Sequence, residues 1–176
     1  HYRIFNANGR EVEQCGNGAR CLASFVRKMG LTWKNKLRVS TIKGIVNLHI
    51  LRNGLVSVDM GIPELTPDKI PLRFANQQLH YDISVNGQSY QFGSVSMGNP
   101  HCVITVDDLD KTDVELIGRS LTEHNIFPQG ANIGFMQIIA KDEIRLRVFE
   151  RGVGETLACG TGACASAVIA RLQHQM

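Results

Sequence analysis

The stretch "RIFNANGREVEQCGNGARCLASFVR" at residues 3–27 has a second version near the other end of the chain, "RVFERGVGETLACGTGACASAVIAR" at residues 147–171. The two segments align without a gap, and both contain a Cys-Gly-x-Gly-Ala run in the same register. The positions of the first segment that are identical in the second are Arg3, Phe5, Glu11, Cys15, Gly16, Gly18, Ala19, Ala23 and Arg27. Self-similarity of this kind indicates two structurally similar halves, each with one thiol at the matched point.

The first copy predicts a short strand over residues 3–6, a polar loop, the thiol and then a helix. From Leu22 to Met29, apolar residues follow helical spacing, and Gly30 is a suitable C-terminal stop. We therefore expect a helix that begins just after Cys15.

The second copy predicts the same order of elements. A strand is expected over residues 143–149, and the alanine-rich run from Gly162 to Arg171 is typical of a helix. Thr161 is a suitable N-cap, so this helix should begin just after Cys159.

The chain between the two copies is predicted to be mostly strands. Three are expected in residues 37–61, with Asn53-Gly54 as a two-residue hairpin turn, and two more in residues 81–97 across Asn86-Gly87. A strand at 101–106 and a modest helix around 113–123 precede the second copy. The fold class expected is α+β, with two pseudo-symmetric domains, each a mainly antiparallel sheet around one prominent helix.

Proline residues suggest where the halves meet. Pro63, Pro67 and Pro71 punctuate one short segment, so we expect an N-terminal domain over residues 1–62 and a C-terminal domain over residues 63–176. Strands follow the first helix but not the second, and strands precede the second copy of the repeat but not the first. Both domains are therefore expected to be incomplete, the first upstream and the second downstream.

Composition excludes several classes of function. The sequence is 43% hydrophobic and 20% charged, which is typical of a globular protein rather than a disordered one. No apolar run approaches the ~20 residues of a membrane span, and the net charge of +3 comes from scattered basic residues. Neither a membrane nor a nucleic acid is an expected partner. Five cysteines, an odd number without a secretion signal, favour reduced thiols in the cytoplasm.

The position of the two thiols suggests their chemistry. The first turn of a helix has unpaired N–H groups and a partial positive charge, so a thiol there should have a lowered pKa and neighbouring amides can hold an anion. The glycines after Cys15 and Cys159 let a ligand approach the backbone. The pattern predicts a site that binds the carboxylate group of a ligand beside a cysteine thiolate.

A pair of thiols is also what inversion of a stereocentre requires. One group removes a proton from one face of a carbon, and a second group returns a proton to the opposite face. The alternative is that Cys15 and Cys159 are ordinary packing residues, as most free cysteines are. The duplicated context favours the catalytic interpretation, whereas Cys21, Cys102 and Cys164 are expected to pack.

Other thiol functions fit less well. A zinc site could use Cys15, Cys21, His101 and Cys102, but no C-x₂-C pair exists and Cys159 would be unexplained. A cysteine phosphatase needs an arginine six positions after its thiol, where this chain has Cys21. A pyridoxal-dependent racemase needs a Schiff-base lysine, and the repeated motifs supply none. We expect neither a metal nor a cofactor.

Four motifs resemble those of diaminopimelate epimerases: "FNANGREVEQCGNGARC", "SVSMGNPHCVI", "GANIGFMQI" and "RVFERGVGETLACGTGACA". The resemblance extends in order and spacing through almost the whole chain. It implies two pseudo-symmetric α+β domains and a pyridoxal-free interconversion of LL- and meso-diaminopimelate in the pathway to lysine and cell-wall precursors. The partner implied is this small-molecule substrate, and a homodimer is an open alternative to a monomer.

The resemblance also implies roles for individual residues. Cys15 and Cys159 would be the acid/base pair, with His101 and Glu150 supporting the thiols and accepting protons near the reacting centre. The reacting carboxylate would be held by Gly16, Asn17, Gly160 and Thr161. The distal amino-acid end would be held by Asn6, Asn99, Asn132 and Arg151, with Glu150 beside them.

Two alternatives remain open from the sequence. A proline racemase-like isomerase of the same fold also pairs two cysteines, although Arg151 and the asparagines suit a second charged amino-acid end better than proline. A catalytically inactive fragment would act only as a binding module.

Overall fold

The computed structural model describes residues 1–5, 9, 11, 15–42 and 44–174. The chain divides into two compact units, His1–Gly61 and Ile62–Met176. Among the described residues, no helix has both the length and the apolar character needed to cross a membrane.

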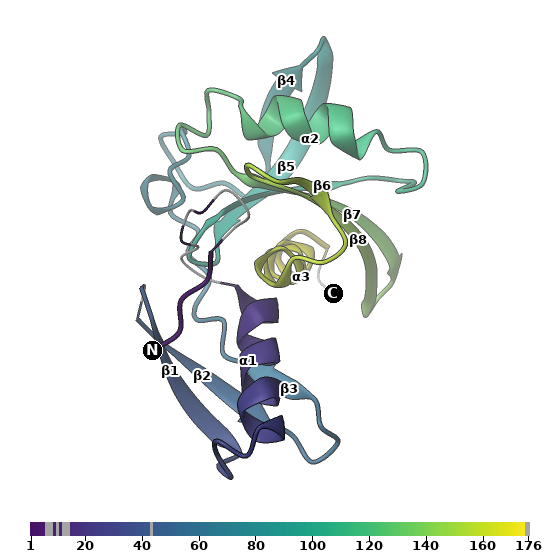
Figure 1. Cartoon of the computed structure of the whole chain (residues 1–176). Coiled ribbons are helices and arrows are strands. Elements are labelled where there is room, and N and C mark those ends of the chain that lie inside the picture. Colours follow the sequence, from purple (N-terminus) through teal and green to yellow (C-terminus); the bar gives the residue numbers. More distant parts are fainter. Residues whose placement is uncertain (6–8, 10, 12–14, 43, 175–176) are drawn as a thin grey trace. The chain divides into compact units, whose positions relative to one another are not determined.

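Among its described residues, the first unit contains one helix and one small sheet. Helix α1 (Gly16–Lys28) precedes the strands β1 (Lys36–Thr41), β2 (Gly44–Ile50) and β3 (Val56–Val58), which pair antiparallel in the order β1-β2-β3. The helix lies against this sheet in Figure 1 and buries Ala19 and Ala23 in a cluster with Leu48 of β2. Small side chains at these positions allow the helix to pack closely on the strands.

Helix α1 ends where the sequence predicts. Gly30 has a φ of +69°, its N–H donates to the carbonyl of Arg27 (3.1 Å), and the Leu31 N–H donates to the carbonyl of Val26 (2.9 Å). This pair of bonds is a Schellman motif, which needs a left-handed residue after the helix and therefore favours glycine.

The second unit contains a six-stranded sheet with helices. Its strands are β4 (Tyr81–Val85), β5 (Gln88–Ser96), β6 (Pro100–Thr105), β7 (Asn132–Ala140), β8 (Glu143–Glu150) and β9 (Gly154–Thr156), in the spatial order of the sequence. Along the chain, helix α2 (Val114–Thr122) comes between β6 and β7, and helix α3 (Gly160–His174) follows β9. A 3₁₀ turn covers Pro67–Lys69. The class is α+β and mainly antiparallel, as expected.

One pair of strands in this unit is parallel. β6 and β7 run in the same direction, with His101 opposite Asn132. Parallel neighbours need a crossover connection, and the segment containing α2 supplies it. The parallel pair places the beginnings of both strands, with His101 and Asn132, at the same edge of the sheet.

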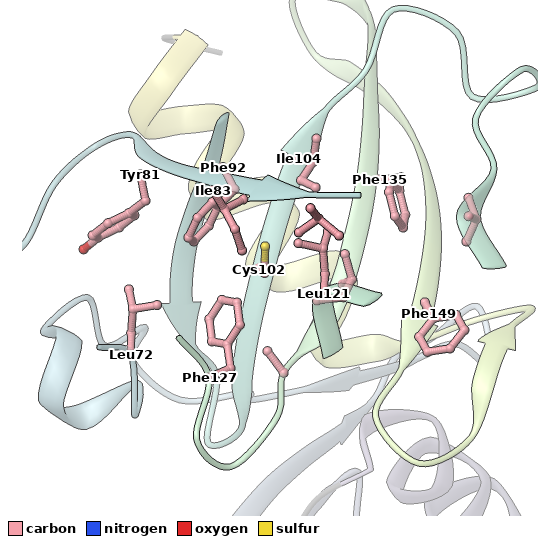
Figure 2. Packing of buried hydrophobic residues seen from close by; sticks show 14 of the residues in the cluster. Leu72, Tyr81, Ile83, Phe92, Cys102, Ile104, Leu121, Phe127, Phe135 and Phe149 are labelled. Carbon is pink, nitrogen blue, oxygen red and sulfur yellow. The ribbon is translucent and has the colours of Figure 1, made fainter. Parts of the chain in front are cut away.

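The two helices of the second unit cover opposite faces of the sheet (Figure 1). On the α2 face, aromatic and aliphatic residues form the main core, in which Figure 2 shows Phe92, Cys102 and Phe149. On the α3 face, Gly93 lies so close to the helix that a Cβ there would be 2.6 Å from Ile169. Because strand residues alternate in direction, the two faces of β6 are filled by different residues.

The hairpin turns were predicted with mixed success. Asn86 and Gly87, with φ values of +52° and +77°, form the predicted two-residue turn, since Val85 pairs directly with Gln88. The prediction for Asn53-Gly54 was wrong. The Gly54 N–H donates to the carbonyl of Leu51, and Gly54 has a φ of +80°, which is the geometry of a longer loop ending in a left-handed residue.

The elements predicted around the repeat were largely confirmed. Strand β8 and helices α1 and α3 lie at the predicted places, and the helix predicted at 113–123 is α2, capped by the Asp113 carboxylate. The strand predicted at residues 3–6 is reduced among the described residues to an isolated bridge at Phe5. Thr161 is not the N-cap of α3, because the helix already includes Gly160 and Thr161.

The structure repeats the internal similarity of the sequence. In the first unit Phe5 bridges Glu11, and in the second the matched residues Phe149 and Glu155 are paired in the same antiparallel sense. In each copy the arginine two positions before the phenylalanine forms an ion pair with that glutamate, at 2.8 Å and 2.7 Å. The repeat therefore extends to side-chain contacts within each unit.

Candidate functional site

Cys15 lies at the start of α1, as the sequence predicts. It is the N-cap residue, and its Sγ accepts a hydrogen bond from the Gly18 N–H at 3.3 Å, so the side chain is directed over the first turn of the helix. The thiol is half-buried. Gly16 beside it is buried, and a Cβ at that position would lie 3.0 Å from the Met60 sulfur. A larger residue at position 16 would crowd the Met60 side chain.

A residue that sequence reasoning missed lies beside this thiol. A Cβ on Gly18 would be 2.4 Å from the Tyr2 hydroxyl, which places that hydroxyl over the first turn of α1. Burial raises the pKa of Tyr2, and the negative charges that Cys15 and Cys21 can take raise it further. The repeat gave no signal, since the position matching Tyr2 in the second copy is Leu146.

Of the other two residues of the first unit that were predicted to bind the substrate, the structure describes one. Asn17 lies in the first turn of α1, and its side-chain oxygen accepts from the Arg20 guanidinium. Asn6, predicted to hold the distal end of the substrate, lies outside the described residues.

Cys159 precedes α3 just as Cys15 precedes α1. In both units the amide four residues on donates to the cysteine carbonyl, from Ala19 at 3.0 Å and from Ala163 at 2.9 Å. Cys159 is half-buried, and its Sγ lies 3.4 Å from the Thr161 hydroxyl. The thiol is therefore held at a helix N-terminus by local hydrogen bonds.

The expected lowering of the Cys159 pKa is not found. Burial raises the pKa of this thiol, and the negative charge of Glu150 raises it further. Hydrogen bonds from the Thr161 side chain and the Gly162 backbone act in the opposite direction. The prediction considered only the helix terminus, whereas in the folded unit desolvation has the larger effect.

Side chains from two other elements extend this arrangement. The Asn99 Nδ2 lies 3.4 Å from the Thr161 Oγ1, and the Asn99 Oδ1 lies 3.1 Å from His101 Nε2. Asn99 lies in the turn between β5 and β6, and His101 lies on β6. Residues far apart in sequence thus form one chain of contacts, from His101 through Asn99 and Thr161 to Cys159.

His101 is a fully buried member of this chain. Burial lowers its pKa to about 4, with a smaller contribution from the positive charge of Arg151, so the imidazole is neutral near pH 7. Its Nδ1 is buried without a hydrogen-bond partner in the described part of the chain. The contact with Asn99 is therefore the one that orients the ring.

Asn132 and Arg151 form a second contact at the same edge of the sheet. The Asn132 Oδ1 accepts from the Arg151 backbone N–H at 3.0 Å, and its Nδ2 donates to the Pro100 carbonyl at 3.4 Å. The Arg151 guanidinium donates to the Gln129 carbonyl at 2.6 Å. Asn132 thus fixes the backbone at Arg151, while the charged end of Arg151 is exposed.

Glu150 is also held by a residue that the sequence analysis did not identify. The Thr156 hydroxyl donates to the Glu150 Oε1 at 2.5 Å. The contact joins the two strands on either side of the turn at Arg151, because β8 ends at Glu150 and β9 includes Thr156. Glu150 is consequently positioned to act on Cys159 through its charge.

The remaining cysteines differ from one another. Cys102 is buried in the core on the α2 face, where burial strongly raises its pKa, and Cys164 is half-buried. Cys21, expected to pack, is exposed, so that expectation was wrong. Adjacent residues of one strand point to opposite faces, so His101 and Cys102 do not share a metal ion. No group of three or more potential metal ligands is found among the described residues.

The sequence matches a family model described as diaminopimelate epimerase over residues 1–66 and 93–176. The fold is similar to that of a PhzF family phenazine biosynthesis protein from Bacillus anthracis, with a TM-score of 0.63 at 22% identity. It is also similar to a hydroxyproline epimerase from Agrobacterium vitis, solved with bound trans-4-hydroxy-L-proline, with a TM-score of 0.69 at 14% identity. These identities show likeness of fold.

The chain is shorter than the structures it resembles. The match covers 96% of this chain and 60% of the Bacillus anthracis protein, and 99% of this chain and 56% of the Agrobacterium vitis protein. A PhzF family protein from Enterococcus faecalis matches in a similar way, with a TM-score of 0.59 at 13% identity. The match covers 96% of this chain and 60% of that protein. The chain thus spans somewhat more than half the length of these proteins.

Proposed function

Because the chain belongs to the diaminopimelate epimerase family, we propose that it acts as a cofactor-independent epimerase that interconverts LL- and meso-diaminopimelate. The observation that supports this most directly is the duplication of one arrangement. A cysteine begins a helix in each unit, and each thiol lies over the first turn of that helix.

The proposed reaction is a proton exchange at one α-carbon. A thiolate accepts the α-proton and becomes a thiol, the C–H electron pair remains as a carbanion, and the second thiol donates its proton to the opposite face and becomes a thiolate. Neither oxidation nor net protonation occurs. The reverse direction uses the same two groups with exchanged roles, which suits matched cysteines such as Cys15 and Cys159.

The surroundings of Cys159 suggest its resting state. Burial and the charge of Glu150 raise its pKa, so near pH 7 it is a thiol and can serve as the proton donor. Turnover in the other direction requires its thiolate, and Glu150 is the nearby carboxylate that can accept the proton. Cys15 would be the partner that accepts the α-proton while Cys159 donates.

In this proposal the N-termini of the two helices bind the carboxylate next to the reacting carbon. Gly16, Asn17, Gly160 and Thr161 belong to the first turns of α1 and α3, and the first turn of a helix is where backbone N–H groups commonly bind anions. Such donors would hold the carboxylate and stabilise the negative charge that develops on it in the carbanion.

The distal end of the substrate would be bound by the polar groups at the edge of the second sheet. Asn132 fixes the backbone at Arg151, whose exposed guanidinium can pair with a carboxylate, and Asn99 lies in the adjacent turn. A second amino-acid end is present in diaminopimelate and absent in proline, so these residues favour the former.

Incubation of the full chain with stereochemically pure LL-diaminopimelate in heavy water tests the proposal. We expect deuterium at one α-carbon and formation of the meso isomer, observed by mass spectrometry and chiral chromatography. Cys15→Ser and Cys159→Ser should each lower the rate by ~10²-fold or more, the loss expected for a missing general acid or base. Full rates in both variants would exclude the two-thiol mechanism.

The same assay addresses the alternatives. The similarity to a hydroxyproline epimerase makes proline and trans-4-hydroxy-L-proline the comparison substrates. Deuterium incorporation into these and not into diaminopimelate would assign the chain to a proline-type reaction. Binding of diaminopimelate in calorimetry without any exchange would favour the binding-module alternative, since the chain spans only part of its structural relatives.

A further inference from the structure

We infer that the Thr161 hydroxyl is a positioning residue that donates a hydrogen bond to the Cys159 sulfur, and that Asn99 and His101 fix the direction of this bond. The inference rests on the proposed function, because it assigns to Cys159 a need for a thiolate during turnover. The backbone N–H of Thr161 is a separate group from this hydroxyl.

The donor and acceptor of each hydrogen bond in this chain of contacts can be assigned starting from His101. The imidazole is fully buried and neutral, so it bears one N–H, and its Nε2 faces the Asn99 side chain at 3.1 Å. With the proton on Nε2, His101 donates to the Asn99 Oδ1. This leaves the Asn99 Nδ2, which can only donate, facing the Thr161 Oγ1 at 3.4 Å.

The direction at Thr161 follows from that at Asn99. The Thr161 oxygen accepts from Asn99, so its own proton is available for the other neighbour, the Cys159 Sγ at 3.4 Å. Thr161 is 4% exposed, so water competes little for this hydroxyl. A hydroxyl that donates to sulfur stabilises the thiolate relative to the thiol.

This bond acts against the other influences on the thiol. Burial of Cys159 and the carboxylate of Glu150, at the end of β8, favour the protonated form. The Gly162 amide of α3 favours the thiolate, as the Thr161 hydroxyl does, and Arg151 lies near His101 rather than acting on the sulfur directly. Thr161 is thus the side chain that keeps the thiolate of Cys159 accessible.

Site-specific alkylation tests the inference without any substrate. The rate of Cys159 modification by iodoacetamide, followed by peptide mass spectrometry from pH 6 to 11, reports the fraction of thiolate. Thr161→Val keeps the shape of the side chain and removes the hydroxyl, and we expect ~10-fold slower alkylation below the midpoint, which corresponds to a rise of about one pKa unit. Thr161→Ser should restore the rate to within about twofold.

The matched control is another hydroxyl of the same helix. Ser166 is fully buried, and its Oγ lacks a hydrogen-bond partner in the described part of the chain, so Ser166→Ala should leave the Cys159 profile unchanged. If Thr161→Val alkylates like the wild type, or if Ser166→Ala slows alkylation equally, the inference is wrong. Circular dichroism of each variant identifies any that fail to fold.

The role of Asn99 is tested by a double-mutant cycle. Asn99→Ala should slow Cys159 alkylation about threefold through loss of orientation at Thr161, and it should have no further effect in the Thr161→Val background. Equal effects of Asn99→Ala in both backgrounds would contradict a chain of hydrogen bonds that runs through Thr161.

The proposed function and the role of Thr161 can fail separately. If the wild-type chain does not turn over diaminopimelate but the alkylation results are as expected, the proposed function is refuted and the assignment of Thr161 stands. Turnover with an unaltered Thr161→Val profile would refute this assignment alone.

Discussion

At the scale of single residues, the second unit shows how burial modifies a prediction from local position. A cysteine at a helix N-terminus is expected to have a lowered pKa. Burial instead raises the pKa of Cys159, with hydrogen bonds from Thr161 and Gly162 only partly offsetting this effect. Position along the chain identified the thiol, but its protonation depends on how deeply the fold buries it.

The same dependence on burial gives a pH prediction for His101. Its pKa in the folded state is about 4, below the ordinary value near 6.5, so the unfolded chain binds a proton at a higher pH than the folded chain does. The stability associated with the neutral imidazole is present above pH 6.5 and is lost as the pH falls toward 4. Between pH 7 and pH 4.5 the loss should be about 2 kcal/mol.

Urea unfolding of the wild type and of His101→Gln at the two pH values measures this loss. The variant should be less sensitive to pH by about that amount, whatever its absolute stability. His80→Gln, at an exposed histidine of the same unit, is the control and should behave like the wild type. Equal pH sensitivity in wild type and His101→Gln would show that His101 is not held neutral by the fold.

Residue identities in the candidate site were predictable to different degrees. The repeat identified both thiols, because only a shared function or structure explains matched Cys-Gly-x-Gly-Ala runs. Tyr2 and Thr156 gave no signal, because their contacts with the first turn of α1 and with Glu150 depend on chain segments brought together by folding. Local patterns therefore located the reactive groups, while their immediate neighbours required coordinates.

At the scale of elements, glycine residues determine how closely helices approach the second sheet. Gly118 lies within α2, and a Cβ at that position would be 2.5 Å from the ring of Phe149 on β8. Glycine within a helix usually destabilises it relative to alanine. Here the contact with a buried aromatic ring reverses that preference.

Gly118→Ala should therefore lower the free energy of unfolding by about 1–3 kcal/mol, the usual effect of overpacking. Leu116→Ala, at an exposed position of the same helix, should change it by about 0.5 kcal/mol or less. Urea denaturation followed by circular dichroism compares the two. A stabilised Gly118→Ala variant would show that helix propensity outweighs the contact with Phe149.

The elements themselves were predictable where the signal is local. Helices α1 and α3 begin after their thiols, and the Asn86-Gly87 turn has the predicted geometry, because spacing and left-handed residues are properties of short segments. The loop at Asn53-Gly54 and the N-cap of α3, expected at Thr161, were mispredicted. In both cases more than one local conformation is compatible with the sequence, so the local pattern does not decide between them.

Across the two units, the two repeated helices bury different faces against the sheets of their own units. Helix α1 packs on β2 and β3, which follow it in the chain, and buries Ala19 and Ala23. Helix α3 packs on β5 to β8, which precede it, and the alanines that match Ala19 and Ala23 are exposed there. Similar sequences thus form helices whose buried faces differ, because each unit provides strands on a different side.

This difference makes a matched pair of substitutions informative. Phe25 of α1 and Ile169 of α3 occupy equivalent positions of the repeat, but Phe25 is 55% exposed and Ile169 is 2% exposed. Phe25→Ala should cost less than about 1 kcal/mol of stability in the first unit, whereas Ile169→Ala should cost about 2–4 kcal/mol in the second. Hydrogen exchange measures the two units separately, because amides of each report its own opening. If Phe25→Ala is as destabilising as Ile169→Ala, then the face of α1 that includes Phe25 is covered in solution, and the two helices are packed on equivalent faces after all.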